Sequence, residues 1–463
     1  CERRGTGPAA LLRRGLLVVL LAVLLGGMLS RFVGAARAQG LPASDEALAD
    51  RIEQALHRHV LAPWYPKAVD TRYGGYLTQF SADWTPFGAQ EKMIVTQARH
   101  VWTLSRAAEF TGRDAFARWA GSGARFLGSE MWDPTYGGFY WLVDRSGEPL
   151  GDRFDGGPIK RAYGQAFALY GLAAYVRVTE DAAALELAKK GFRWLEDHSH
   201  DPDYGGYFQF LRRDGTPFPA GYEGTPPKDQ NSSIHLLEAF TELYHVWPDP
   251  LLEERLREML VLVRDTMVSD RGHLHLFFHR DWDPVSYRDS ATVVREAHFG
   301  LDHVSFGHDI ETAYLLLEAD SALGGGVSPR TRSVARRLLT QSVRYGWDTE
   351  RGGIYDGGLY VPGSDSVRIV DDGKAWWAQV EALNSLLLGR QLVPDQRARY
   401  DRLFRTQWSY IDEYLIDHDR GGFYGAGLDT RPDTRDGSKG HIWKGSYHTA
   451  RSLMNVVEGL RRE

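Results

Sequence analysis

Several apolar stretches of this chain carry ionisable side chains at the spacing of one helix face. Asn231, His235 and Glu238 stand at i, i+4 and i+7, and His308 and Glu311 stand at i and i+3. Each set therefore lies on one side of a helix. Buried ionisable groups cost free energy unless they have partners, and histidine is well suited to acid–base catalysis near neutral pH. The pattern indicates proton-transfer chemistry inside a helical protein.

Three further segments repeat this pattern. Arg99 lies within the apolar stretch 96–102, Trp377 and Glu381 stand at i and i+4, and His448 lies near an expected helix start. One such residue alone is typical of a core side chain with satisfied hydrogen bonds, or of an ion pair. Their recurrence in successive parts of the chain favours a set of inner helices whose polar side chains point into a shared funnel.

Signatures of metal and cofactor sites are weak or missing from the sequence. His273, His275 and His279 form a loose group, but alternation along an extended segment explains it equally well, and no carboxylate stands beside it at ligand spacing. The chain has no Walker loop, no G-x-G-x-x-G after a strand, no H-E-x-x-H and no G-x-S-x-G. Its one Cys excludes a thiolate zinc cluster. We therefore predict neither a metal nor a cofactor.

A repeated turn shows which elements position these residues. The motif is an Asp, three further residues, Gly-Gly and then an aromatic or aliphatic residue. It returns roughly every 70 residues. Glycine pairs supply the backbone freedom that a tight turn needs. The copies are residues 70–76, 133–139, 201–207, 348–354 and 417–423, with a degenerate copy at 269–274.

Between these turns lie segments with helical periodicity, such as 183–195 and 334–343. Each unit of about 70 residues holds two helices of ordinary length with their loops. Six helical hairpins predict an all-α fold, an (α/α)6 barrel, with short extended pieces after the turns. An open solenoid is the alternative, but such arrays usually carry polar capping repeats, and neither terminal unit resembles one. We expect residues 39–463 to form this single domain.

Composition limits the class of protein. Apolar residues make up 43% of the 463 residues, which excludes a disordered chain. A net charge of −6 argues against binding to nucleic acid.

The N-terminal residues 1–38 have the features of an export signal. Arg13 and Arg14 precede a short apolar run, 15–29, and Ala36-Arg37-Ala38 fits a cleavage site. The run is short for a membrane span, which needs about 20 residues. We expect a cleaved signal peptide and an exported protein, periplasmic or secreted. The alternative is an uncleaved segment that anchors the protein to a membrane.

The motifs together resemble the N-acylglucosamine 2-epimerase superfamily, which includes cellobiose 2-epimerases and mannose isomerases. The resemblance covers roughly residues 45–460 and rests on six motifs in order. They are Gln97-Ala-Arg99, Tyr163-Gly-Gln165, Asn231 with His235-Leu-Leu-Glu238, Gly307-His308-Asp-Ile-Glu311, Trp376-Trp377-Ala-Gln-Val-Glu381 and Trp443-Lys-Gly-Ser-Tyr-His448. The resemblance implies an (α/α)6 barrel that epimerises or isomerises reducing sugars without a metal.

It also implies roles for the candidate residues. The acid/base histidines are His308 and His448, one removing the C2 proton and the other returning a proton to the opposite face through a cis-enediolate. Of the remaining residues, His235 and Arg99 are expected to stabilise the oxyanion, and Glu311 to orient His308. Tyr163, Asn231 and Glu381 are expected to bind sugar hydroxyls, Trp377 and Trp443 to stack on sugar rings, and Glu238 to be a hydrogen-bonding partner within the site.

Two departures and several alternatives accompany this interpretation. Val380 and Ser446 replace residues that are usual at these positions, and the second weakens the likeness to cellobiose epimerases. The first choice is a 2-epimerase of a glucose- or mannose-type reducing end. Alternatives are an aldose–ketose isomerase, an N-acylglucosamine 2-epimerase, an inverting glycoside hydrolase using Glu311 and Glu381, and a non-catalytic sugar-binding protein. The partner is a small sugar, and the chain is a monomer or homodimer.

Overall fold

The computed structural model describes residues 40–42, 44–151, 157 and 159–462. The chain divides into two compact units, residues 1–48 and 49–463, and nearly all described residues belong to the second. The segment predicted to be a signal or an anchor, and the boundary after residue 38, lie outside the described residues. None of the described helices is long and apolar enough to cross a membrane.

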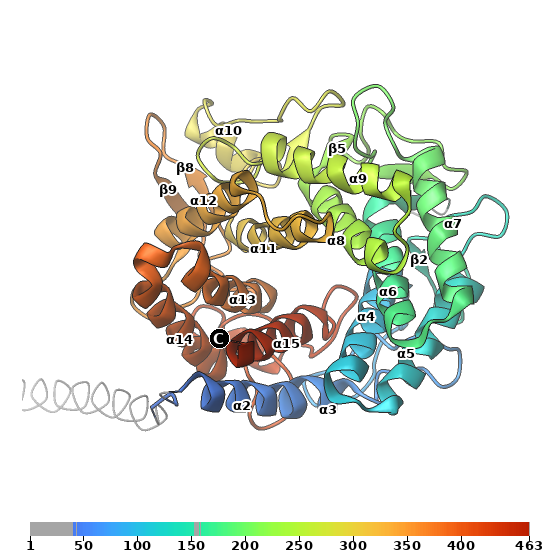
Figure 1. Cartoon of the computed structure of the whole chain (residues 1–463), viewed down its shortest axis with the longest axis horizontal. Coiled ribbons are helices and arrows are strands. Elements are labelled where there is room, and N and C mark those ends of the chain that lie inside the picture. Colours follow the sequence, from blue (N-terminus) through green and yellow to red (C-terminus); the bar gives the residue numbers. More distant parts are fainter. Residues whose placement is uncertain (1–39, 43, 152–156, 158, 463) are drawn as a thin grey trace, which may run out of the picture. The chain divides into compact units, whose positions relative to one another are not determined.

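Six inner helices of the second unit form a closed ring (Figure 1). They are α4 (Ile94–Thr111), α6 (Ala162–Thr179), α8 (Gln230–Val246), α11 (Phe306–Ala322), α13 (Trp376–Leu392) and α15 (Tyr447–Arg462). Each contacts the next, and α15 contacts α4, so the ring has no open end. Every residue of α6 from Ala162 to Val176 is buried, as expected for a helix that is covered on all sides.

An outer layer of helices packs against this ring. It consists of η1 (Leu56–Leu61) between α2 (Asp45–Ala55) and α3 (Ala62–Trp64), α5 (Asp114–Phe126) with η2 (Leu127–Met131), α7 (Ala182–His198), α9 (Pro250–Val261) with η3 (Leu262–Met267), α12 (Pro329–Gly346) and α14 (Arg397–Tyr414). These helices are amphipathic: α7 buries Ala184, Ala188, Phe192 and Leu195 at the spacing of one face. The predicted (α/α)6 barrel is confirmed, and closure excludes the open solenoid.

The repeated Asp-Gly-Gly turns are held by a buried ion-pair cluster. In the first copy, Gly74 and Gly75 have positive φ, and Asp70 pairs with Lys92 and Arg145. Gln97 in α4 accepts from the backbone N–H of Tyr76 and donates to its carbonyl. The turn is therefore tied to the start of the inner helix that follows it.

The same cluster recurs in other units, as Asp133 with Lys160 and Arg213, Asp201 with Lys228 and Arg280, Asp348 with Lys374, and Asp417 with Lys439 and Arg420. In the degenerate fourth unit, His273 Nδ1 lies 2.6 Å from Asp309 Oδ2. This buried pair accounts for His273, one of the three histidines considered as a loose metal group.

Short antiparallel strands precede the inner helices. β1 (Lys92–Met93) pairs with β2 (Leu142–Val143), β3 (Ile159–Arg161) with β4 (Phe210–Arg212), and β5 (Lys228–Asp229) with β6 (Phe277–Phe278). β7 (Val304–Ser305), β8 (Gly357–Tyr360) and β9 (Val367–Asp371) form the largest sheet. The remaining short helices are α10 (Thr292–Ala297), η4 (Pro394–Gln396) and η5 (Pro432–Asp436). β1, β3, β5 and β7 lead directly into α4, α6, α8 and α11, so these strands lie at the starts of four inner helices.

Candidate active site

The inner helices bring the predicted polar residues to the mouth where these helices begin. They are Arg99 on α4, Tyr163 on α6, Asn231, His235 and Glu238 on α8, His308 and Glu311 on α11, Trp377 and Glu381 on α13, and His448 on α15. All except Glu238 lie within the first two turns of their helices. Residues far apart in the sequence thus form one cluster, as the helical spacing predicted.

A pocket of about 330 Å³ opens at this mouth. Four of the predicted residues line it, Tyr163, Asn231, His308 and Trp443. Trp443 is 46% exposed, and its ring centroid lies 5.9 Å from that of Trp141. The size suits a small ligand, and the paired indoles offer flat apolar surfaces beside polar groups.

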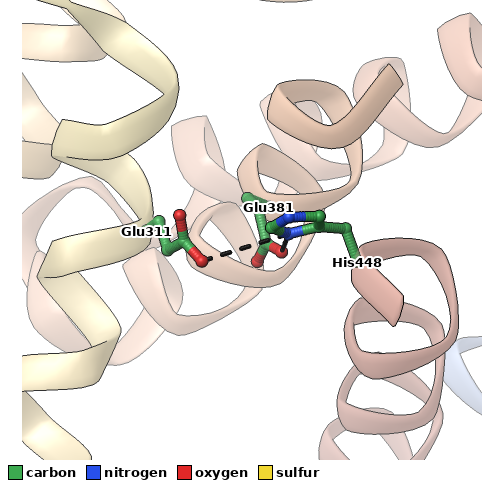
Figure 2. A group of neighbouring side chains, drawn as sticks. All are labelled: Glu311, Glu381 and His448. Atoms are coloured by element: carbon green, nitrogen blue, oxygen red, sulfur yellow. Dashed lines mark hydrogen bonds and ion pairs between the residues drawn. The ribbon is translucent and has the colours of Figure 1, made fainter. Parts of the chain in front are cut away.

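His448 is held by a carboxylate on the neighbouring helix. Its Nδ1 lies 2.6 Å from Glu381 Oε1. Figure 2 shows these two side chains with Glu311 beside them. Because the carboxylate accepts, Nδ1 carries a proton and donates it, which leaves Nε2 as the free basic nitrogen. Burial, with the charges of Arg99 and Arg451, holds the pKa of His448 well below 6.5. The imidazole is therefore neutral at neutral pH and able to accept a proton.

His308 has a different partner from the one predicted. Its Nδ1 lies 2.7 Å from the hydroxyl oxygen of Ser305, so Glu311 does not orient the ring by a hydrogen bond and that prediction is wrong. Burial lowers the pKa of His308 to about 4, while the charge of Glu311 acts in the opposite direction. The ring centroids of His308 and His448 lie 4.8 and 5.6 Å from that of Trp377, so the indole lies beside both histidines.

Arg451 links the carboxylates of three inner helices. Its guanidinium pairs with Glu238 on α8, Glu311 on α11 and Glu381 on α13. This explains why Glu311 is unavailable to His308: its carboxylate is bound by the arginine. The sequence motif that ends at His448 stops one helical turn before Arg451, and that spacing is the signal that would have found it.

Glu381 is fully buried and its two carboxylate oxygens are engaged. One contacts His448 and Arg451, and the other accepts from Tyr314 at 2.9 Å and Ser452 at 3.2 Å. The prediction that Glu381 binds sugar hydroxyls is therefore wrong, because no acceptor position faces the pocket. Its role is to position His448.

His235 and Glu238 form a second pair. His235 Nδ1 lies 2.8 Å from Glu238 Oε2, and Tyr447 donates to Glu238 Oε1 at 2.6 Å. Burial raises the pKa of Glu238, but Arg451 and His235 outweigh it and bring the value to about 2. Glu238 thus accepts hydrogen bonds from His235 and Tyr447 within the cluster.

Arg99 projects between aromatic rings near this pair. It donates to the hydroxyl of Tyr163 at 3.0 Å and stacks over Phe167 and Tyr447, 4.3 and 5.0 Å from the ring centroids. Arg99 is buried, with 6% of the residue exposed. A positive charge held at this depth attracts an anion formed nearby.

The group Glu311, Glu381 and His448 could hold a metal ion by distance alone, since their ligand atoms lie within 4.8 Å of one another. The guanidinium of Arg451 already pairs with both carboxylates, so a cation would compete with it for the same oxygens. The donor set does not fit a resident metal.

Sequence reasoning missed several other residues of the pocket. Trp141, Asp229, His303 and Ser305 line it. The last three come from the strands and loops just before α8 and α11, and Trp141 from the loop before β2. Their side chains carry no helical periodicity, which is why the pattern search passed over them.

Known proteins resemble the chain over nearly its whole length. It is 28% identical over 422 residues to the cellobiose 2-epimerase of Bacteroides fragilis, covering 89% of this chain and 99% of that protein. It is 23% identical over 417 residues to the D-mannose isomerase of Marinomonas mediterranea, covering 88% and 97%. The structure of the cellobiose 2-epimerase from Spirochaeta thermophila matches with a TM-score of 0.77 and 29% identity, covering 92% of this chain and 99% of that one.

The family model of the N-acylglucosamine 2-epimerases matches residues 75–452. That range takes in all the inner-helix segments that carry the site, from Arg99 on α4 to Arg451 on α15. Because the match spans well over half of the sequence and includes every side chain of this cluster, the protein belongs to the N-acylglucosamine 2-epimerase family.

Proposed function

We propose that this protein is a sugar 2-epimerase that inverts C2 of a reducing-end aldose of the glucose or mannose type. A β-linked disaccharide such as cellobiose is the first candidate substrate. The observation that carries the proposal is the pair His308 and His448. His448 is buried and His308 is partly buried, the pKa of each is held below 6.5, and they approach the same indole from different helices.

The reaction needs a base and an acid on opposite faces of C2. Opening of the sugar ring forms the C1 carbonyl, which makes the C2 proton acidic. His448 removes it through Nε2, and the resulting imidazolium is stabilised by Glu381 at the other nitrogen. A cis-enediolate remains. His308 then returns a proton to the opposite face and gives the epimer.

Both imidazoles are neutral at the start of the cycle. His308 must therefore take up a proton from solvent water before it protonates C2, and His448 releases the proton it removed from C2 to solvent afterwards. The negative charge of the enediolate raises the proton affinity of a nearby imidazole. The two histidines also differ in their partners. The carboxylate beside His448 fixes one tautomer, whereas the Ser305 hydroxyl beside His308 can either donate or accept. Because its Nε2 is fixed as the unprotonated nitrogen, we assign His448 as the base that acts on the glucose-type epimer.

Electrostatic stabilisation of the enediolate falls to Arg99 and His235, whose placement beside Tyr163 supports this role. Removing one donor of this kind typically costs about 10²–10³-fold in kcat. Tyr163 and Asn231, which line the pocket, bind sugar hydroxyls, and Trp443 stacks on a sugar ring.

Product-resolved NMR tests the proposal. The protein is incubated in heavy water with cellobiose, mannose and N-acetylmannosamine, and the products and deuterium at C2 are followed. The C2 epimer with deuterium at C2 supports it. A ketose as the only product would replace it with the isomerase function, which the likeness to a mannose isomerase favours as second candidate. Free monosaccharides from cellobiose would indicate a glycoside hydrolase.

We further propose that the protein is exported, on the basis of residues 13–38. Cell fractionation with N-terminal sequencing of the mature chain checks this. A chain that begins near residue 39 outside the cytoplasm is expected, whereas a full-length chain in the membrane fraction would indicate an anchor.

A further inference from the structure

The loop before α15 leads from one active-site residue to another. Trp443 lines the catalytic pocket, and His448 follows five residues later, in the first turn of α15. Trp443 is 46% exposed, whereas Lys444, Ser446 and Tyr447 are buried. The positions of both active-site side chains therefore depend on what holds this buried stretch of chain.

Contacts from α4 and from the residue after α3 hold this loop. Thr96 on α4 donates its hydroxyl to the carbonyl oxygen of Ile442. The hydroxyl oxygen of Tyr65, directly after α3, lies 2.9 Å from Ser446 Oγ. The same hydroxyl lies 2.6 Å from Nδ1 of His100, one turn beyond Thr96 on α4. The contacts with Ile442 and Ser446 span 346 and 381 residues of sequence, so they join the end of the chain to its beginning.

Ser446 stands at the position that caps α15. Its carbonyl oxygen accepts from the backbone N–H of Ala450, as the N-cap residue of a helix does. A serine at this position usually turns its hydroxyl toward the N–H groups of the first turn. Within the described residues, Ser446 Oγ makes no such bond and lies against the Tyr65 hydroxyl instead. The hydroxyl that would cap the helix is therefore used to join its start to another segment.

The Tyr65 hydroxyl lies in an enclosed environment. Tyr65 and His100 are 5% and 1% exposed, and the Tyr65 ring stacks on Trp119 of α5 with 6.4 Å between the ring centroids. Burial lowers the pKa of His100 to about 3, so its imidazole is neutral. A buried polar group that loses its partner costs about 1–3 kcal/mol. Movement of Ser446 away from Tyr65 is therefore opposed.

We propose that Tyr65 is a positioning residue of the active site, which acts through Ser446 to fix the start of α15 and, with it, the imidazole of His448. This inference rests on the proposed function, because that function makes His448 a base. His448 Nδ1 lies 2.6 Å from Glu381 Oε1 on α13, and a shift of the helix start would change that distance. A misplacement of about 1 Å can lower a rate about 10²-fold.

Two substitutions remove the bond, one from each side. Ser446→Ala and Tyr65→Phe each delete one hydroxyl and keep the rest of the side chain. We expect each to lower kcat for C2 deuteration about 10- to 100-fold, with a much smaller change in KM. The double variant should be no slower than the slower single variant, because both changes remove the same bond. Ser446→Thr, which retains a hydroxyl, should keep most of the activity.

A matched control and a stability measurement separate positioning from a structural role. Ser105→Ala is the control, because the buried Ser105 hydroxyl donates to Val101 within α4, and this variant should keep its kcat. Rates are measured well below the unfolding temperature of each variant. A bond that is merely structural would lower the free energy of unfolding and leave kcat of the folded protein unchanged. That result for Ser446→Ala and Tyr65→Phe would overturn the proposal, and if one of them does not fold, the other carries the test.

Histidine NMR gives a readout that does not depend on the reaction. The full chain is labelled with 15N-histidine, and the ring signals of His448 are assigned from the variant His448→Ala. In Ser446→Ala and Tyr65→Phe these signals should shift toward a mixture of tautomers, because the contact with Glu381 loosens. If they shift but the wild-type protein takes up no deuterium at C2, the positioning role stands and the proposed function fails. Unchanged His448 signals in both variants would overturn the positioning role.

Discussion

Individual side chains of the site differ in how well spacing along the chain predicts them. The two histidines and Glu238 face inward as helical periodicity indicates. Glu311 and Glu381 also face inward, but each contacts Arg451 on α15 rather than a residue of its own helix or a ligand. Partners across helices depend on how neighbouring helices are rotated and staggered, and no single-helix pattern contains that information.

Replacing His448 with Ala removes the base that Glu381 positions. We expect a fall of about 10²–10⁴-fold in epimerisation, the usual contribution of a general acid or base. Initial rates of C2 deuteration by NMR measure it. The exposed residue His279 provides the matched control, His279→Ala, which should keep full activity. A His448→Ala protein that still cleaves cellobiose would point to hydrolysis instead.

The acid limb of the activity profile reports the same histidines. A base is active in its neutral form, and burial moves the pKa of His308 to about 4 and that of His448 well below 6.5. The neutral forms persist as pH falls below 6.5, so the acid limb of kcat/KM should lie below pH 6.5. Rates measured from pH 4 to 8, with unfolding checked at each pH, test it. A midpoint at or above 6.5 would contradict the buried, neutral assignment.

At the scale of elements, the Gly-Gly turns correctly predicted the number of helical hairpins. The structure shows in addition that ion pairs between aspartate and lysine side chains hold these turns. In four of the clusters the lysine, such as Lys92 or Lys228, stands two residues before the start of an inner helix and reaches back to the turn. The sequence shows these lysines, but their pairing with an aspartate more than 20 residues away requires the folded hairpin. The short strands were expected only as extended pieces.

Asp201 illustrates how these turns respond to acid. Burial raises its pKa, but Arg280 and Lys228 outweigh burial and lower it to about 2. A carboxylate with a depressed pKa stabilises the fold above its unfolded value, near 4, and loses that contribution as pH falls toward 2. Asp201→Asn should therefore destabilise the protein more at pH 6 than at pH 3.

Urea unfolding at the two pH values measures this difference. The exposed residue Asp289 gives the control Asp289→Asn, for which no such pH dependence is expected. If Asp201→Asn lowers the free energy of unfolding equally at both pH values, the cluster stabilises the turn through packing and hydrogen bonds rather than through the charge of Asp201.

At the scale of the whole ring, closure depends on α15, which packs against both α13 and α4. Leu453 lies in this helix and is fully buried. Leu453→Ala should lower the free energy of unfolding by about 2–5 kcal/mol, the range for a buried leucine. Because His448 and Arg451 lie on the same helix, activity should be lost at a lower temperature as well.

Chemical denaturation followed by circular dichroism, with rates at rising temperature, measures both effects. Leu251→Ala, at a residue that is 39% exposed, is the control and should change stability little. A variant that loses stability but keeps its activity up to the same temperature would contradict this. It would show that the packing of α15 against α13 and α4 does not hold the site in place.

All six inner helices carry their catalytic-site residues within their first two turns, so all six begin on the same side of the ring. Each helix start carries a partial positive charge of about half an elementary unit, so six aligned starts surround the pocket with the same sign. An enediolate formed there lies in a field that the backbone itself creates, before any side chain contributes. The direction in which the chain threads the ring is thus part of the chemistry, and a ring of the same side chains on reversed helices would oppose it.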